Sequence, residues 1–160
     1  MKVLITIFLY LIYFYSQNRL QNGIQIDARN ASALCPRTNQ TCVVGIATPY
    51  MGVAHRGIVV MNTTHTSYLS WYPKRVGGSG AIGFWASFVV PMMGEVRKDG
   101  IVHRAMNNSG IFVAEWVTTV PQEKLVELLH NAPLAYSPVL MGIPYVSNCN
   151  SWTRMIRSAI

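Results

Sequence analysis

Cys149 is the residue whose type and position point most clearly to chemistry, because it lies at the predicted start of a helix. Trp152, Met155 and Ile156 recur at helical spacing after it, and Asn148 before it is a favoured N-cap. A thiol in the first turn of a helix has a lowered pKa, since the free N–H groups and the helix dipole favour the thiolate. The same N–H groups can stabilise an oxyanion. The spacing therefore predicts a nucleophilic cysteine, with an inert buried thiol as the alternative.

A nucleophilic thiol needs a base that manages protons, and the chain offers four histidines. His65 lies in a polar turn, and His103 lies in a polar strand or loop. His130 lies in the last turn of a predicted helix, where a positive charge is favoured. His55 begins a run rich in β-branched residues, which ties it to the core. It is therefore the candidate base, with a hydrogen-bonded structural histidine as the alternative.

A sheet is expected to position these side chains. Apolar and β-branched runs bounded by turn residues predict strands at 43–48, 55–62, 66–72, 84–90 and 110–118. Residues 62–65 join the second and third strands as a hairpin, and 98–101 mark another turn. One helix is expected over 121–130 and another from Cys149. The fold class is predicted to be α+β, a small antiparallel sheet with helices packed on one side.

The first residues predict export from the cell. Lys2 precedes an almost wholly apolar run over 3–15, and polar residues follow it. This pattern is typical of a signal peptide, here residues 1–17, and the run is shorter than the roughly 20 residues of a spanning helix. The protein is expected to be secreted or extracellular. An uncleaved membrane anchor through residues 3–15 is the alternative. Residues 18–42 then form a polar segment, and residues 43–160 form the domain.

An oxidising compartment gives the three cysteines different roles. Cys35 and Cys42 flank a short loop and are expected to form a disulfide. Cys149 is then left as a free thiol, with a bond to another chain as the alternative. Acceptor sequons for N-glycosylation favour the same compartment. They lie at Asn30, Asn39, Asn62 and Asn107.

Four segments follow one another along the chain: His55-Arg-Gly-Ile-Val-Val, Tyr68-Leu-Ser-Trp-Tyr-Pro, Val120-Pro and Ser147-Asn-Cys-Asn-Ser-Trp. Their order resembles the circularly permuted papain-like thiol hydrolases, relatives of the Nlp-type cell-wall endopeptidases and of lecithin–retinol acyltransferase. In that group the histidine strand precedes the cysteine helix. The resemblance spans about residues 43–160.

The resemblance implies a role for each of several residues. Cys149 would be the nucleophile, and His55 would be the general base. Asn148, or the backbone N–H of Cys149, would help to hold the oxyanion. The residue that orients the histidine would lie on the strand after it, on the face that bears Tyr68 and Ser70.

Composition limits the classes of partner. The net charge of +7 suits an anionic partner, but no run of Lys or Arg marks a nucleic-acid site, so no nucleic-acid partner is expected. The glycine-rich segment 77–80 lacks the Lys-Ser/Thr of a phosphate loop. The histidines and cysteines lack metal-ligand spacing. Neither a cofactor nor a metal is expected.

The expected function is that of a secreted cysteine hydrolase that cleaves an amide bond in a peptide or a cell-wall peptide. One alternative is a lipid acyltransferase or thioesterase-like enzyme that uses the same pair, Cys149 and His55. The other is a catalytically inactive binding module of the same fold. The substrate would accordingly be a peptide, a cell-wall component or a lipid.

Overall fold

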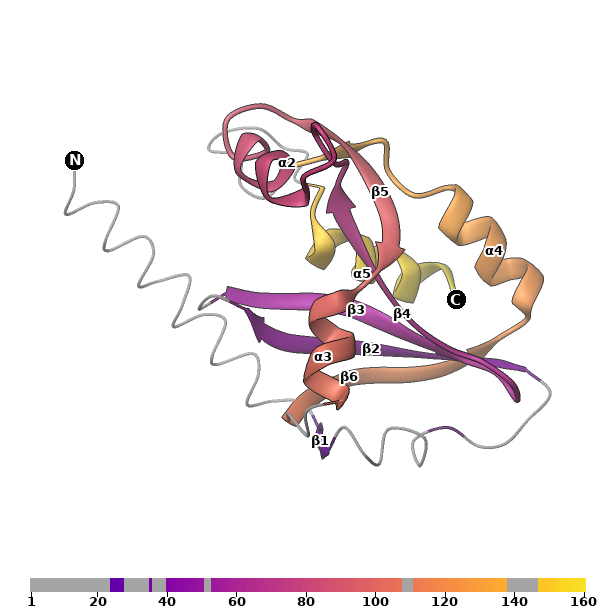
Figure 1. Cartoon of the computed structure of the whole chain (residues 1–160). Coiled ribbons are helices and arrows are strands. Elements are labelled where there is room, and N and C mark those ends of the chain that lie inside the picture. Colours follow the sequence, from indigo (N-terminus) through magenta and orange to yellow (C-terminus); the bar gives the residue numbers. More distant parts are fainter. Residues whose placement is uncertain (1–23, 28–34, 36–39, 51–52, 108–110, 138–146) are drawn as a thin grey trace.

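An antiparallel sheet with helices around it makes up the part of the chain that the structure describes (Figure 1). The computed structural model describes residues 24–27, 35, 40–50, 53–107, 111–137 and 147–160. The predicted export segment lies outside these residues, as do the sequons at Asn30 and Asn39. Within them, no helix is long and apolar enough to cross a membrane.

The sheet has the strand order β1-β6-β2-β3-β4-β5-β7, and every neighbouring pair is antiparallel. Its strands are β1 (Ile24–Asp27), β2 (Thr41–Tyr50), β3 (Val53–Met61), β4 (Thr66–Pro73), β5 (Met92–Lys98), β6 (Ile111–Val120) and β7 (Ala135–Tyr136). The predicted hairpin at 62–65 is confirmed, since the N–H of Asn62 donates to the carbonyl of His65 at 3.0 Å. β1 lies in the polar segment 18–42, where no strand was predicted. The α+β class is confirmed.

Alternation along the strands gives the sheet two apolar faces. On β2, Val44 and Ile46 belong to one buried cluster, together with Phe112 of β6. Val43 belongs to the other, together with Trp152. A sheet that is apolar on both faces must be covered on both, so helices are needed on either side.

Four helices flank this sheet in the described residues: α2 (Gly80–Ala86), α3 (Gly100–Asn107), α4 (Gln122–His130) and α5 (Cys149–Ala159). Val102 of α3 packs in the cluster of Phe112. Leu125 of α4 and Ile156 of α5 pack in the cluster of Trp152. The two helices predicted after residue 120 are confirmed. The prediction that helices pack on one side is wrong, because each apolar face has its own cover.

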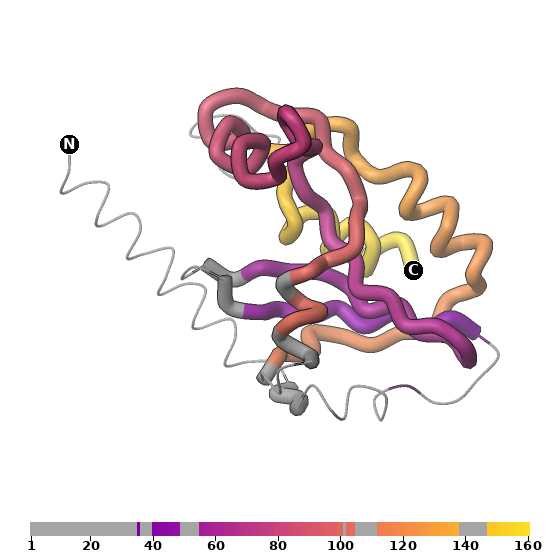
Figure 2. The backbone as a smooth tube through the Cα atoms, in the orientation of Figure 1, coloured from indigo at the N-terminus to yellow at the C-terminus, as the bar shows by residue number. Residues whose placement is uncertain are grey.

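The strand predicted over 84–90 is also wrong, because residues 80–86 form α2. Figure 2 follows the chain as it leaves the sheet after β4, passes through this helix and returns as β5. Ser79 caps the helix with its side chain, and Gly83 packs so closely that a Cβ there would lie 2.4 Å from the carbonyl oxygen of Lys74. A short apolar run does not distinguish a strand from a helix by its spacing.

The predicted disulfide between Cys35 and Cys42 is present, with the two Cα atoms 6.3 Å apart. Cys42 lies at the start of β2 and is buried in the cluster of Phe112. The disulfide therefore links Cys35 covalently to a buried residue of the core. Cys149 is the free cysteine of the described residues.

Candidate active site

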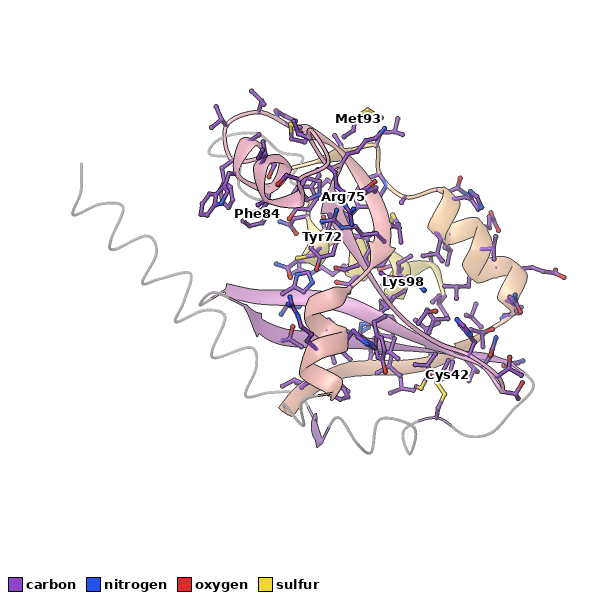
Figure 3. The ribbon with its side chains drawn as sticks, viewed as in Figure 1. Cys42, Tyr72, Arg75, Phe84, Met93 and Lys98 are labelled. Atoms are coloured by element: carbon purple, nitrogen blue, oxygen red, sulfur yellow. A yellow bond between two sulfur atoms is a disulfide. The ribbon has the colours of Figure 1, made fainter. Side chains whose placement is uncertain are left out.

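Four side chains meet where β3, β4 and two helix N-termini come together. His55 lies on β3 and Tyr72 on β4, and their rings stack with centroids 5.3 Å apart. Asp99 lies between β5 and α3, and Cys149 is the first residue of α5. Tyr72 is labelled in Figure 3 and marks this place in the fold.

The contacts run in series from the thiol to the carboxylate. The side chain of Cys149 forms a hydrogen bond with the ring of His55. Nε2 of His55 lies 2.5 Å from Oδ2 of Asp99 and 3.0 Å from the hydroxyl oxygen of Tyr72. The Tyr72 hydroxyl donates to Oδ1 of Asp99 at 2.9 Å. Nε2 of His55 is therefore held by two side chains, those of Asp99 and Tyr72.

Local structure holds the carboxylate of Asp99 in place. Its Oδ1 accepts the N–H of Val102 at 3.0 Å, so the side chain also caps the first turn of α3. The backbone N–H of Asp99 donates to the carbonyl of Tyr68 at 2.6 Å. Gly57 makes room for it, because a Cβ there would lie 3.2 Å from Oδ2 of Asp99 and 2.8 Å from the carbonyl oxygen of Leu69. The buried carboxylate can therefore reach the histidine strand.

The thiol is positioned by the cap of α5. Oδ1 of Asn148 accepts the N–H groups of Asn150 and Ser151 at 2.9 and 3.1 Å. The N–H of Asn148 donates to the hydroxyl of Ser151 at 2.8 Å, which completes a capping box. The predicted N-cap is thus confirmed. Because the cap oxygen takes the next two N–H groups, the N–H of Cys149 itself is left out of the cap and lies beside its own sulfur.

Electrostatics favour an ionised pair at the centre of this site. Burial alone would hold His55 neutral, but its hydrogen bond with Asp99 and its contact with Cys149 outweigh burial and raise the pKa of His55 to about 10. Burial likewise opposes ionisation of the thiol, yet the hydrogen bond and charge of His55 lower the pKa of Cys149 below its usual value. Both shifts favour a thiolate beside an imidazolium.

The two groups that face Nε2 have opposite pKa shifts. Burial raises the pKa of Tyr72, and the nearby charge of Asp99 raises it further, so the phenol stays protonated and donates. Burial would raise the pKa of Asp99, but the hydrogen bond and charge of His55 lower it below its usual value. Asp99 therefore stays ionised as the counter-ion of the imidazolium.

Arg56 joins the histidine strand to the cysteine helix. Its backbone N–H hydrogen-bonds Cys149 and, with its charge, helps to lower the pKa of that thiol. Its guanidinium donates to Oδ1 of Asn150 at 2.6 Å and to Oε1 of Glu115 at 2.8 Å. Both hydrogen bonds are shielded from solvent because Arg56 is buried. Residues adjacent in sequence, His55 and Arg56, thus both contact the first turn of α5.

The structure brings Cys149, His55 and Asn148 together but gives Tyr68 and Ser70 other neighbours. The hydroxyl of Ser70 donates to the carbonyl of Arg56 at 2.7 Å and is buried between the two strands. The ring of Tyr68 packs against the cluster of Phe112 and lies 5.2 Å from the ring of His103. The side chain of β4 that contacts His55 is that of Tyr72, two residues after Ser70.

Sequence reasoning missed Asp99, which it placed in a turn. The available signal was an aspartate that precedes a helix, since aspartate is a favoured N-cap. His103 lies within that helix, α3, rather than in a strand or loop. Asn107 is the last residue of the same helix, and Asn62 is exposed in the hairpin turn.

Comparison of the chain with models of protein families, with curated proteins and with solved structures found no match. The resemblance to the permuted papain-like hydrolases therefore rests on the sequence segments that carry it. The chemistry proposed below rests on the geometry of Cys149, His55 and Asp99.

Proposed function

We propose that the protein is a cysteine hydrolase that cleaves an amide bond through an acyl-enzyme formed on Cys149. The observation that carries the proposal is the series of contacts from the Cys149 thiol through the His55 ring to the Asp99 carboxylate. A nucleophile, a base and a group that orients the base are the parts that covalent acyl transfer needs. Asp99, rather than Tyr68 or Ser70, takes the orienting role in this proposal.

In the first half of the proposed reaction, the Cys149 thiolate attacks the carbonyl carbon of the substrate. The oxygen that becomes negative is stabilised by the N–H of Cys149 at the positive end of α5. His55 then gives its proton to the departing amine, the carbon–nitrogen bond breaks, and a thioester remains on Cys149. Asn148 contributes through the helix cap, because its side-chain oxygen already accepts two N–H groups.

In the second half, His55 is neutral and accepts a proton from water as that water attacks the thioester. The acid product leaves, Cys149 returns to the thiolate and His55 to the imidazolium. Asp99 and Tyr72 hold Nε2 throughout, which fixes the orientation of the ring beside Cys149. Asp99 stabilises the positive charge of the ring without itself changing protonation.

A lipid acyltransferase or thioesterase-like enzyme is the second candidate. The thioester on Cys149 would be the same, and an alcohol or amine would replace water as the acceptor. The observation that favours it is the exposed apolar surface of α2, which begins beside the site: a Cβ at Gly80 would lie 3.3 Å from the guanidinium of Arg97, and that guanidinium lies 4.3 Å from the centre of the Tyr72 ring. We propose secretion as the setting for either activity.

Alkylation of the thiol tests the proposed chemistry. Iodoacetamide labelling of Cys149, mapped by mass spectrometry, is expected to proceed well below the pH of about 8.5 at which a free thiol ionises. His55→Ala should move this profile to higher pH and slow labelling at pH 6.5. His65→Ala, which removes an exposed histidine of the hairpin turn, is the matched control and should label as the wild type does. An ordinary thiol profile in the wild type would contradict the proposal and favour an inactive binding module.

A substrate screen then separates the two candidate enzymes. The wild type is incubated with peptide amides and with lipid esters, and intact mass identifies an acyl group on Cys149. Cys149→Ser serves as the control for adducts formed elsewhere. An adduct from peptides alone supports amide hydrolysis, and one from lipids alone supports lipid acyl transfer.

A further inference from the structure

An apolar surface covers one end of the molecule, formed by α2 and the residues that follow it. We call it the α2 surface. It consists of large exposed apolar side chains, those of Ile82, Trp85, Phe88, Val89 and Val90. Trp85 is 62% exposed and Val89 is 84% exposed. Isolated exposed apolar residues are ordinary, but five within nine residues of sequence form a patch of the kind that marks an interaction site.

The side chains of the α2 surface are ordered by contact with one another. The rings of Phe84, Trp85 and Phe88 meet pairwise, with centroids between 5.2 and 5.8 Å apart. The hydroxyl of Ser87 donates to the carbonyl of Phe84 at 2.6 Å and holds the end of the helix. The aromatic cluster is therefore a preformed, outward-facing feature.

The fold does not need these apolar side chains for its core. Gly83 is the buried residue of α2, and it packs against the carbonyl of Lys74. The helix thus packs through its glycine on the segment that follows β4, while Trp85 and Phe88 are exposed. Trp85 and Phe88 are exposed and belong to neither buried cluster of the described residues, so their exposure calls for a partner.

The charges around the α2 surface indicate the chemistry of that partner. Residues 73–93 contain no acidic residue, and they include Lys74 and Arg75, both exposed. Figure 3 shows Arg75 and Phe84 at the same end of the molecule. An exposed tryptophan beside apolar and basic side chains is typical of segments that lie in a membrane interface, where anionic headgroups attract the cations. The net charge of +7 favours the same approach.

We propose that the α2 surface docks the protein on an anionic lipid membrane. Trp85, Phe88 and Val89 enter the boundary between headgroups and acyl chains. Lys74 and Arg75 face the lipid phosphates. Because α2 begins beside Arg97, whose guanidinium lies over the Tyr72 ring, docking would bring the membrane close to the site that contains Cys149. The docking itself needs no chemistry at Cys149, so it stands independently of the proposed function.

A readout at Trp85 itself is needed, because the apolar segment 3–15 of the full chain could hold the protein on a vesicle by another route. The full chain is mixed with vesicles of phosphatidylcholine and phosphatidylserine that carry brominated acyl chains, which quench tryptophan fluorescence on contact. Trp85→Phe isolates the signal of this residue from the other three tryptophans. We expect quenching in the wild type that is lost in Trp85→Phe. Equal quenching in both proteins, or none in either, would overturn the proposal.

Variants of the neighbouring residues test which contacts matter. Phe88→Ser combined with Val89→Ser should remove most of the quenching at Trp85. Lys74→Glu combined with Arg75→Glu should abolish its dependence on phosphatidylserine. Val126→Ser removes an exposed apolar side chain from α4 and is the matched control, expected to behave as the wild type.

Two further measurements distinguish membrane docking from effects of the thiol chemistry and from self-association of the protein. Cys149→Ser should be quenched as the wild type is, which separates a failure of docking from a failure of the thiol chemistry. Light scattering gives the oligomeric state without lipid. If the wild type self-associates and Phe88→Ser with Val89→Ser makes it monomeric, while vesicles leave Trp85 unquenched, the α2 surface is an interface between copies of the chain and the proposal is wrong.

Discussion

Gly57 is the small residue that lets two distant parts of the chain meet at the site. Any side chain there would press against the Asp99 carboxylate and the carbonyl of Leu69. The approach gives His55 a buried counter-ion, and this in turn favours the thiolate of Cys149. At the residue scale, the reactivity of the thiol therefore depends on a carboxylate 50 positions away in sequence.

Asp99→Asn tests that dependence with little change in shape, because an asparagine oxygen can still cap α3. Loss of the negative charge should lower the pKa of His55 and raise that of Cys149. At a pH below the thiol pKa, each unit of rise in that pKa reduces the thiolate about tenfold. We therefore expect the pH profile of iodoacetamide labelling of Cys149 to move to higher pH in Asp99→Asn, with slower labelling on its acid side.

The difference between Asp99→Asn and the wild type should narrow as pH rises, since a higher pH ionises the thiol in both proteins. Glu127→Gln, which neutralises an exposed carboxylate on α4, is the control and should leave the whole profile in place. Superimposable profiles for Asp99→Asn and the wild type would show that the carboxylate does not act on the thiol.

At the scale of the element, α5 depends on the cap at Asn148. Asn148→Ala removes the oxygen that accepts two N–H groups and should lower the free energy of unfolding by about 1 kcal/mol. Asn148→Ser keeps a capping oxygen and should lose much less. Urea denaturation followed by circular dichroism measures both. If alanine and serine were equivalent at this position, the cap would not be what holds the helix start.

The elements that sequence predicted well are those whose signals are local. Asn148 and the stripe of Trp152 and Ile156 lie within nine residues and define α5 by themselves. The role of Asp99 could not be predicted in this way, because it follows from the pairing of β5 with β4, which brings the end of one strand beside the carbonyl of Tyr68. The sequence of the turn does not show which distant strand will pair with the strand before it.

Among the elements that were not predicted, the helices α2 and α3 were missed for related reasons. The residues of α2 are apolar enough to be a strand, and only the cap at Ser79 and the close contact of Gly83 favour a helix. α3 covers the second face of the sheet through Val102, and its existence follows from that face being apolar. A short segment of sequence does not show whether one face or both faces of a sheet must be buried under helices.

At the scale of the whole molecule, the site lies at a junction between the sheet and the first turns of α3 and α5. β3 carries His55 and Arg56 to the first turn of α5, and β4 carries Tyr72 to the same place. The helix packs through Trp152 on the cluster shared with α4. Stability and reactivity therefore use the same contacts, and the titration of the site should appear in the unfolding of the domain.

The pH dependence of stability follows from two opposing titrations. The pKa of His55 is about 10 in the folded chain against 6.5 when unperturbed, so its contribution is complete below pH 6.5 and is lost as pH rises towards 10. Cys149 has the opposite sign: its pKa is lowered from 9.0, so its contribution grows with pH until the unfolded thiol also ionises. The two effects oppose each other up to about pH 9, and above it only the loss from His55 remains.

We therefore expect the free energy of unfolding to fall between pH 9 and pH 10, with a slope of up to about 1.4 kcal/mol per pH unit for the one proton involved. His55→Gln, whose amide can still donate to Asp99, should flatten this fall. His65→Gln should retain it, since that histidine is exposed in the hairpin turn. Urea denaturation at each pH measures the free energy of unfolding of all three proteins. The ionisation of tyrosines and lysines affects the three alike, so it cancels when their slopes are compared. An equal slope in the wild type and His55→Gln would mean that His55 does not hold its proton through this range, and the ion pair with the thiolate would have to be abandoned.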